Sequence, residues 1–157
     1  MKPQHTSGES IDEADLLRRA RAARSRAYAP YSGFHVGAVV LTDDGRVFEG
    51  ANVENASYPL TACAEANAVR SMAMTGRVSP IVAVAVVGDG EDAITPCGAC
   101  RQIIFEFGPT ATVYGSGDGG RPIVTSIKDL LPHAFGPRRL SQGHGPDGGW
   151  AGGPDEL

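Results

Sequence analysis

The run Ile81–Val87, which reads IVAVAVV, restricts the fold more than any other feature of the sequence. Every side chain in this run is apolar, so it lacks the polar–apolar alternation of a half-exposed strand. A strand of this kind has to be covered on both faces, as happens in sheets that carry helices on either side. We therefore expect Ile81–Val87 to lie inside a sheet that is sandwiched between two helical layers.

Helical and strand patterns alternate along the rest of the chain. A capping box, Ser10-Ile-Asp-Glu13, precedes a helical pattern that extends to about Tyr28, with one apolar face at Ala14, Leu16, Leu17 and Ala20. The other expected elements are strands at Val36–Thr42, Arg46–Glu54 and Thr112–Tyr114 and helices at Thr61–Thr75, Cys97–Phe107 and Ser126–Leu131. This order favours an α/β fold, a three-layer α-β-α sandwich around one mixed sheet.

Charge and cysteine content argue against several classes of protein. The 157 residues carry a formal net charge of −4, whereas a sequence-tolerant nucleic-acid binder needs a basic face. No apolar run approaches the ~18 residues of a membrane span, and the first ten residues lack the apolar stretch of a secretory signal. Three cysteines cannot all pair as disulfides. We expect a cytoplasmic protein without nucleic-acid or membrane partners, whose cysteines serve chemistry or a metal.

The two ends of the chain differ in composition from its middle. Residues 141–157 contain six Gly and two Pro, with Trp150 as the single aromatic residue. A segment of this kind buries too little surface to offset its ordering entropy. We expect disorder over residues 141–157 and over residues 1–9, and one folded catalytic domain over residues 10–140.

Two short cysteine motifs indicate the chemistry. Cys63-Ala-Glu65 and Pro96-Cys97-Gly-Ala-Cys100 each open a predicted helix, where free backbone N–H groups favour thiolates. Three thiolates that converge from two helix starts would bind Zn²⁺ and leave its fourth position for water, as in catalytic zinc sites. Glu65 lies two residues after Cys63, so its carboxylate can accept a proton from that water without binding the metal.

Other interpretations of these residues stay open. His35 or His133 would complete a closed structural site with three cysteines and one histidine. A lone C-x-x-C is also found in thioredoxin-like redox proteins, although Cys63 then has no role. A glutamate in the first turn of a helix often does no more than compensate the helix dipole.

The two cysteine motifs together resemble the signature of the zinc-dependent nucleoside and nucleobase deaminases. Four segments resemble the cytidine deaminase family and follow its order, namely Pro30–Gly37, Asn52–Tyr58, Pro96–Gln102 and Leu130–Phe135. The resemblance covers about residues 15–140 and implies a five-stranded mixed sheet with helices on both faces. The cysteine-first form is similar to the small homotetrameric members. It implies one Zn²⁺ per subunit and sites completed by neighbouring subunits.

The resemblance also implies a substrate pocket. Asn52 and Glu54 match an N-x-E pair that holds the ribose, and residues i and i+2 of the expected strand share one face. Phe34 matches an aromatic residue that packs against the pyrimidine. Phe135 resembles an aromatic residue contributed by a neighbouring subunit, and Tyr58 is expected to reach an adjoining subunit's sugar site.

One position departs from the family pattern. Relatives with three thiolates often carry Arg directly after the C-A-E glutamate, where Ala66 stands here. Three thiolates on Zn²⁺ leave a formal charge of −1, which weakens the metal as a Lewis acid. We expect helix N-termini and Arg101, which follows Cys100, to compensate this charge.

The activity implied by the resemblance is the hydrolytic deamination of cytidine and deoxycytidine to uridine and deoxyuridine, with release of ammonia, in pyrimidine salvage. Blasticidin-type deaminases share both cysteine motifs but lack the N-x-E and A-F features found here. A non-catalytic zinc-stabilised interaction module is a further alternative, and it requires a fourth protein ligand. The acidic balance disfavours an RNA- or DNA-editing role, because a polynucleotide channel needs Lys and Arg.

Overall fold

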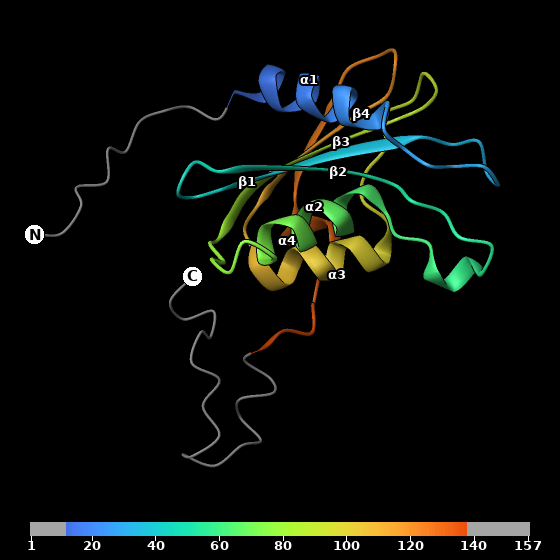
Figure 1. The fold of residues 1–157 in the computed structure, drawn as a ribbon. Coiled ribbons are helices and arrows are strands. Elements are labelled where there is room, and N and C mark those ends of the chain that lie inside the picture. Colours follow the sequence, from blue (N-terminus) through green and yellow to red (C-terminus); the bar gives the residue numbers. More distant parts are fainter. Residues whose placement is uncertain (1–11, 138–157) are drawn as a thin grey trace, which may run out of the picture.

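The computed structural model describes residues 12–137 as one mixed sheet between two helical layers (Figure 1). The strands are β1 (Val36–Thr42), β2 (Val47–Ala51), β3 (Ile81–Gly88), β4 (Thr112–Ser116) and β5 (Ile123–Ser126). Their order in the sheet is β2-β1-β3-β4-β5. Strands β3 and β4 run parallel, and the other neighbouring strands pair antiparallel.

Helices cover both faces of the sheet, which confirms the predicted three-layer sandwich. Helix α1 (Glu13–Arg24) lies on one face, and Figure 1 shows the other helices on the opposite face. These are α2 (Ala64–Ala73), α3 (Gly98–Phe107) and α4 (Ile127–Leu130), with the short 3-10 helix η1 (Tyr58–Leu60) ahead of α2. Within residues 12–137, none of the helices combines the length and apolarity that crossing a bilayer requires. The segments 1–9 and 141–157, for which disorder is predicted, lie outside the described residues.

Strand β3 occupies the centre of the sheet, as its composition predicts. Ala83, Ala85 and Val87 pack in the cluster that includes α1, whereas Val84 packs in the cluster formed with α2, α3 and α4. None of these four side chains has measurable exposure. Burial on both faces therefore explains why β3 shows no polar–apolar alternation.

Two glycines let the helices lie unusually close to the sheet. A Cβ atom on Gly37 would stand 2.0 Å from the carbonyl oxygen of Ala20 in α1. A Cβ atom on Gly50 would stand 2.2 Å from the carbonyl oxygen of Ala64 and 2.5 Å from the backbone nitrogen of Ala68, both in α2. The bare backbone at Gly50 therefore sets the position of the first turn of α2 on the sheet.

Helix α1 is shorter than predicted. The residue that caps it is Asp12, whose side chain accepts a hydrogen bond of 3.1 Å from the Asp15 N–H, while Ser10 lies outside the described residues. The helix ends at Arg24, not at Tyr28. Its buried face carries Leu16, Leu17, Ala20 and Ala23, and the predicted face residue Ala14 is exposed.

Strand β2 also ends earlier than predicted, at Ala51. The side-chain oxygen of Asn52 accepts from the Val36 N–H at 2.8 Å, and its amide nitrogen donates to the Phe34 carbonyl at 2.9 Å. These two hydrogen bonds occupy the Val36 N–H and the Phe34 carbonyl, main-chain groups with which a longer β2 would pair. Beyond this point Val53 forms only isolated bridges, so Asn52 and Glu54 do not share a regular strand.

The remaining predicted elements agree with the structure except at their ends. The Ala-rich helix starts at Ala64 and not at Thr61, because η1 and an extended Cys63 precede it. Helix α4 begins after Ser126, whose side chain accepts from the Asp129 N–H at 3.1 Å. Strand β5 is absent from the predicted order of elements and was implied only by the five-stranded family fold.

Candidate active site

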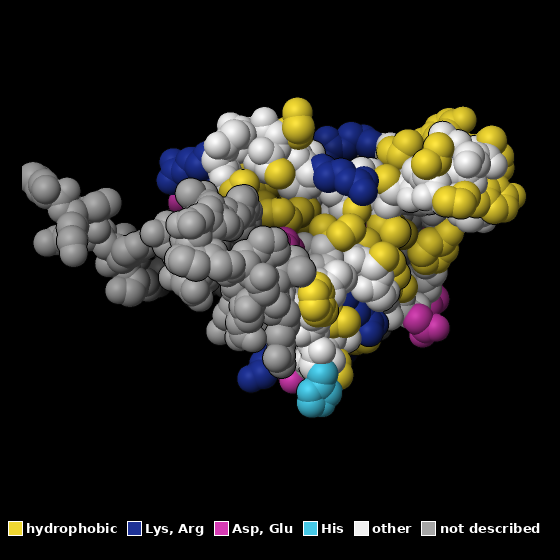
Figure 2. Space-filling model, turned by 90° about the horizontal axis from the view of Figure 1, so that it is seen from below, with side chains coloured by type: hydrophobic (Ala, Val, Ile, Leu, Met, Phe, Trp, Pro, Cys, Tyr) yellow, Lys and Arg dark blue, Asp and Glu magenta, His cyan; other side chains and the backbone are white. Residues whose placement is uncertain are grey.

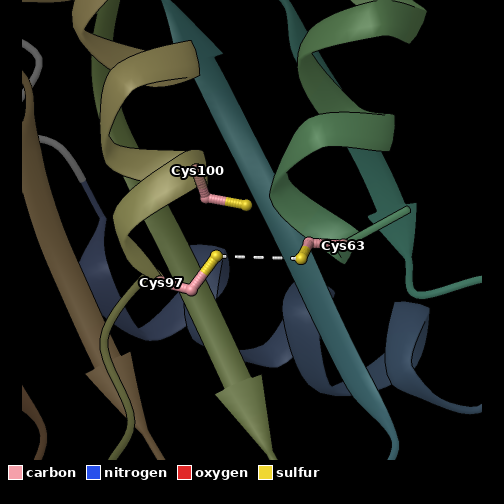
Figure 3. A group of neighbouring side chains, drawn as sticks. All are labelled: Cys63, Cys97 and Cys100. Atoms are coloured by element: carbon pink, nitrogen blue, oxygen red, sulfur yellow. Dashed lines mark hydrogen bonds between the residues drawn. The ribbon is translucent and has the colours of Figure 1, made fainter. Parts of the chain in front are cut away.

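The three cysteines come together where α2 and α3 begin. Cys63 is the N-cap residue of α2, Cys97 is the N-cap residue of α3, and Cys100 lies in the first turn of α3. Figure 3 shows the three thiols directed toward one another. Their sulfur atoms all lie within 4.8 Å of one another, and the Cys63 and Cys97 sulfurs are 3.8 Å apart.

This geometry fits a zinc ion. With Zn–S bonds of about 2.3 Å and tetrahedral angles, two sulfur ligands stand about 3.8 Å apart. The Cys63–Cys97 separation has this value, and the cysteines are free thiols. Soft thiolate donors in a compact set of three suit zinc better than Mg²⁺ or Ca²⁺, which prefer oxygen ligands.

Two of the thiols, Cys63 and Cys100, have shifted pKa values. A hydrogen bond from Cys100 is the main cause that lowers the pKa of Cys63 to about 6, and the positive charge of Arg70 lowers it further. That same hydrogen bond, together with burial, raises the pKa of Cys100. Arg70 stands one helical turn after Ala66, so α2 still carries a positive charge near the sulfurs.

Glu65 lies beside the sulfurs in the first turn of α2. Its side chain is only 4% exposed, and its carboxylate oxygen Oε2 is 3.6 Å from the Cys100 sulfur. Burial raises the pKa of Glu65 above that of an ordinary glutamate. A buried carboxylate next to the sulfur cluster is placed to exchange protons with a molecule bound there.

Neither histidine considered as a fourth ligand belongs to the sulfur cluster. In the described part of the chain, the one group of potential metal ligands consists of Cys63, Cys97 and Cys100. The ring nitrogen Nδ1 of His35 instead lies 2.8 Å from the Asp89 carboxylate. The cluster over residues 12–137 therefore has three protein ligands, as in catalytic zinc sites.

Asn52 and Glu54 both contact the loop between α1 and β1. Asn52 binds the backbone of Phe34 and Val36, as described above. Glu54 accepts hydrogen bonds from the Tyr31 N–H at 2.8 Å, from the Ser32 N–H at 3.2 Å and from the Ser32 hydroxyl. The two predicted sugar-binding residues therefore hold the loop that carries Phe34.

Phe34 lies over the end of β3. Atom Cζ of its ring would be 3.0 Å from a Cβ atom on Gly88, and the Ile94 side chain lies over the same glycine. Ile94 is three residues before Cys97, so the ring packs beside the segment that leads to the metal ligands. The Phe34 side chain remains 41% exposed, which leaves part of it open to a ligand.

Tyr58 and Phe135 are highly exposed for aromatic residues, at 70% and 59%. The Tyr58 and Tyr31 rings contact each other edge to face, with centroids 5.8 Å apart. Tyr58 belongs to an apolar patch that we call the η1 patch, formed by Tyr28, Tyr31, Val53, Tyr58 and Leu60. Hydrophobic side chains gather over the end of the molecule that holds η1 (right in Figure 2).

Arg101 braces the segment before Cys97. Its guanidinium donates to the Pro96 carbonyl at 2.7 Å, to the Leu130 carbonyl at 3.1 Å and to the Thr95 hydroxyl at 3.3 Å. These partners are neutral, so the contacts of Arg101 are structural. Its compensation of the thiolate charge stays a prediction.

Four residues near the site were not found by sequence reasoning. Ser32 lies inside the segment Pro30–Gly37, but nothing in the pattern of that segment indicates its contact with Glu54. Phe34 and Ile94 lie over the same glycine, Gly88, only in the folded chain, and Gln102 donates to the Phe135 carbonyl at 2.9 Å. These contacts join segments far apart in the sequence, so local patterns do not indicate them.

Comparisons with known proteins identify the family of the chain. The family description "Cytidine and deoxycytidylate deaminase zinc-binding region" matches residues 10–116. A cytidine deaminase of Halalkalibacterium halodurans is 46% identical over 126 residues, which are 80% of this chain and 95% of the relative. A cytidine deaminase of Mycobacterium tuberculosis is 42% identical over 126 residues, 80% of this chain and 91% of the relative.

Solved structures show the same fold. A crystal structure of cytidine deaminase from Burkholderia pseudomallei matches with a TM-score of 0.75 and 50% identity, over 80% of this chain and all of that one. The cytidine deaminase structure from Mycobacterium tuberculosis matches with a TM-score of 0.70 and 43% identity, over 81% of this chain and 99% of the other.

Proposed function

Because this chain belongs to the cytidine and deoxycytidylate deaminase family, we propose that it deaminates cytidine and deoxycytidine to uridine and deoxyuridine with release of ammonia. The observation that carries the proposal is the buried Glu65 carboxylate, 3.6 Å from one sulfur of a three-thiol cluster. A proton-carrying group beside a metal site with an open position suits hydrolysis better than a closed structural role.

The three cysteines would hold one Zn²⁺ per chain. When bound, zinc supplies a water of lowered pKa as the nucleophile for carbon C4 of the pyrimidine. The chain's own contribution is the fixed geometry, since both helix starts direct thiols to one point and their free N–H groups offset negative charge.

Glu65 is the proton carrier in this proposal. Its carboxylate accepts the proton of the attacking water and donates it to N3 of the ring, which makes C4 electrophilic. Glu65 then takes the remaining proton of the hydroxyl added at C4 and donates it to the amino group, so the C4–N bond breaks, ammonia leaves and C4 keeps the oxygen as a carbonyl. Acid–base catalysis of this kind typically contributes 10²–10⁴-fold to the rate.

The substrate pocket rests on Phe34, Asn52 and Glu54. The exposed part of the Phe34 ring is available to stack on the pyrimidine. An ionised carboxylate accepts about four hydrogen bonds, and Glu54 receives three from the loop, so one position is free for a sugar hydroxyl. Asn52 likewise keeps one N–H and one lone pair beyond its two backbone contacts.

We further propose that the enzyme is a homotetramer in which neighbouring subunits complete each site. The exposed side chains of Tyr58 and Phe135 are the residues we assign to a neighbour's pocket. Gln102 holds the Phe135 carbonyl, so the segment that presents this ring is attached to the helix that carries two metal ligands. We place the catalytic domain at about residues 10–140 and the enzyme in the cytoplasm, where three free thiols stay reduced.

The test is the ultraviolet absorbance of cytidine incubated with purified protein before zinc removal, after chelation and after zinc is returned. We expect the protein to convert cytidine before zinc removal, to lose this activity after chelation and to regain it when zinc is returned. Deoxycytidine, free cytosine and a blasticidin-type aminopyrimidine nucleoside serve as parallel substrates. No conversion of cytidine by the zinc-loaded protein would overturn the activity, whereas conversion of the blasticidin-type substrate alone would overturn the substrate.

A further inference from the structure

We propose that Ser32 is a positioning residue whose hydroxyl links the sugar-binding carboxylate of Glu54 to Phe34, the residue that packs against the base. The inference deepens the proposed function and rests on it. Sequence reasoning gave Ser32 no role, although it lies inside the segment Pro30–Gly37 that resembles the family.

A single oxygen atom makes the link. The Ser32 hydroxyl donates to Glu54 Oε1, and the same Ser32 Oγ accepts from the Phe34 N–H at 3.0 Å. A hydroxyl has one proton to donate and two lone pairs to accept with. Its proton forms the hydrogen bond to Glu54, and one of its lone pairs accepts from the Phe34 N–H. The two contacts together fix the orientation of the hydroxyl.

The direction of the first hydrogen bond follows from the charge on Glu54. An ionised carboxylate only accepts hydrogen bonds, so the serine has to donate its proton to Glu54 and turn its lone pairs elsewhere. The hydroxyl of Ser32 is the main cause that lowers the pKa of Glu54, and a glutamate is ionised near neutral pH already at its ordinary pKa. A lone pair of Ser32 is thereby presented to the Phe34 N–H.

The backbone of Phe34 is thus held on both sides. Ser32 binds its N–H, and the Asn52 amide donates to its carbonyl at 2.9 Å. Gly33 lies between Ser32 and Phe34 with φ +66°, a backbone conformation that glycine adopts without strain. The Phe34 ring is partly exposed, so packing restrains it less than it would restrain a core residue. The two hydrogen bonds to the Phe34 backbone therefore set the position of the ring.

The contacts predict a specific kinetic defect when the hydroxyl is removed. The hydrogen bonds of Ser32 join it to Glu54 and Phe34 and not to Glu65 or the three thiols, so the chemical step is expected to continue. Phe34 would be less well placed to receive the base, and Glu54 would lose a donor that orients it toward the sugar. We therefore expect Ser32→Ala to raise KM for cytidine about tenfold while kcat changes less than twofold.

The experiment compares Ser32→Ala with Ser32→Thr, which keeps the hydroxyl. Steady-state kcat and KM for cytidine, bound zinc and melting temperature are measured for each purified variant. We expect Ser32→Thr to retain most of the wild-type KM and all variants to keep zinc. Ser25→Ala is the matched control, because Ser25 is also exposed and bonds only to the Ala22 carbonyl at the end of α1.

A second arm tests the link to Phe34. In a Phe34→Leu background, Ser32→Ala is expected to raise KM by a smaller factor than in the wild type, because the ring it positions is gone and only its contact with Glu54 remains to be lost. An unchanged KM in Ser32→Ala, an equal defect in Ser32→Thr, or full additivity with Phe34→Leu would each overturn the inference. An inactive wild-type protein would instead overturn the proposed function.

Discussion

Glu54 and Glu65 are two residues of the same type whose surroundings differ in the way that their proposed tasks require. Glu54 is reached by three donors of the loop and its pKa is lowered, so it stays a carboxylate that accepts hydrogen bonds. Glu65 is buried beside the sulfurs and its pKa is raised. A glutamate that binds and a glutamate that carries protons are expected to differ in this direction.

Glu65→Gln separates metal binding from proton transfer. The amide has nearly the same shape, but it cannot accept and return a proton, and the three thiols are unchanged. We expect bound zinc to remain at one per chain and kcat to fall by at least 10²-fold. Ammonia release from cytidine and metal analysis of the same sample check this outcome. Near wild-type turnover would contradict the role of Glu65.

Gly88→Ala tests whether Phe34 forms one wall of the pocket. The new methyl group would stand 2.6 Å from atom Cδ1 of Ile94 and 3.0 Å from atom Cζ of Phe34. Both contacts are ends of side chains, so the fold is expected to survive while the Phe34 ring shifts. KM for cytidine should rise several-fold with a melting temperature within about 2 °C of wild type. An unchanged KM would show that the ring does not contact the substrate.

At the scale of elements, Gly50 decides where α2 lies. A Cβ atom there would meet backbone atoms of Ala64 and Ala68 at 2.2 and 2.5 Å, and backbone cannot move aside as a side chain can. We expect Gly50→Ala to cost about 1–3 kcal/mol of stability. Because Cys63 is the N-cap residue of α2, the shift should also weaken zinc binding, measured as metal retained after dialysis against a chelator.

Gly98→Ala is the matched control for that change. Gly98 lies between Cys97 and Cys100, yet a Cβ atom on it meets nothing within 4 Å. We expect this variant to retain zinc and stability although it lies closer to the metal in sequence. If Gly98→Ala loses zinc and Gly50→Ala does not, the close approach of α2 and β2 is not what sets the cluster.

The success of sequence reasoning differed between elements for physical reasons. The core strand carries a local signal in its unbroken apolar run, and the helices that follow Cys63 and Cys97 carry helical patterns, although the first of them begins at Ala64 and not at Thr61. Strand β5 is four residues long with two exposed apolar side chains, so no local pattern marks it. The early end of β2 depends on a side-chain contact of Asn52 with the start of β1, which is a tertiary effect.

The same distinction holds for the candidate site. Cys63, Glu65, Cys97 and Cys100 follow fixed spacings, and the structure brings them together. Other contacts arise only because folding brings distant residues together. Arg101 donates to the Leu130 carbonyl, and Ser32 donates to Glu54. Spacing along the chain predicts ligands, whereas the contacts that orient them emerge only from the packed elements.

Over the whole molecule, acidic residues with lowered pKa values join distant segments. Asp44 accepts hydrogen bonds from Thr42, Arg46 and Ser79, and the bond from Thr42 is the main cause that lowers its pKa. Asp89 and Asp118 connect the end of α1 to β3 and β4 through Arg24. These carboxylates have lowered pKa values as well.

Asp44 should make the free energy of unfolding depend on pH. Its folded-state pKa is below the unfolded value of about 3.9. Its contribution to the free energy of unfolding is therefore complete above that pH and is lost as the pH falls further. The difference in urea midpoint between wild type and Asp44→Asn should therefore be largest at pH 6 and shrink below about pH 4. Both proteins keep the same metal ligands, so zinc release cancels in this difference. A difference that grows in acid would contradict the assignment.

The η1 patch is the surface on which the proposed homotetramer can be tested. Leu60 is 69% exposed within it, and a patch of this kind on a monomer marks a contact surface. If neighbouring copies cover it, Leu60→Asp should place a charge in an interface, lower the measured mass from four times 16.3 kDa and reduce activity with cytidine at least tenfold.

Met74→Asp is the control, because Met74 is 85% exposed at the opposite end of α2 and lies outside the patch. Light scattering coupled to gel filtration gives the mass, and zinc content shows whether each subunit keeps its fold. A tetramer in both variants would remove the η1 patch from the interface, and full activity of a dissociated Leu60→Asp protein would show that each chain holds a complete site.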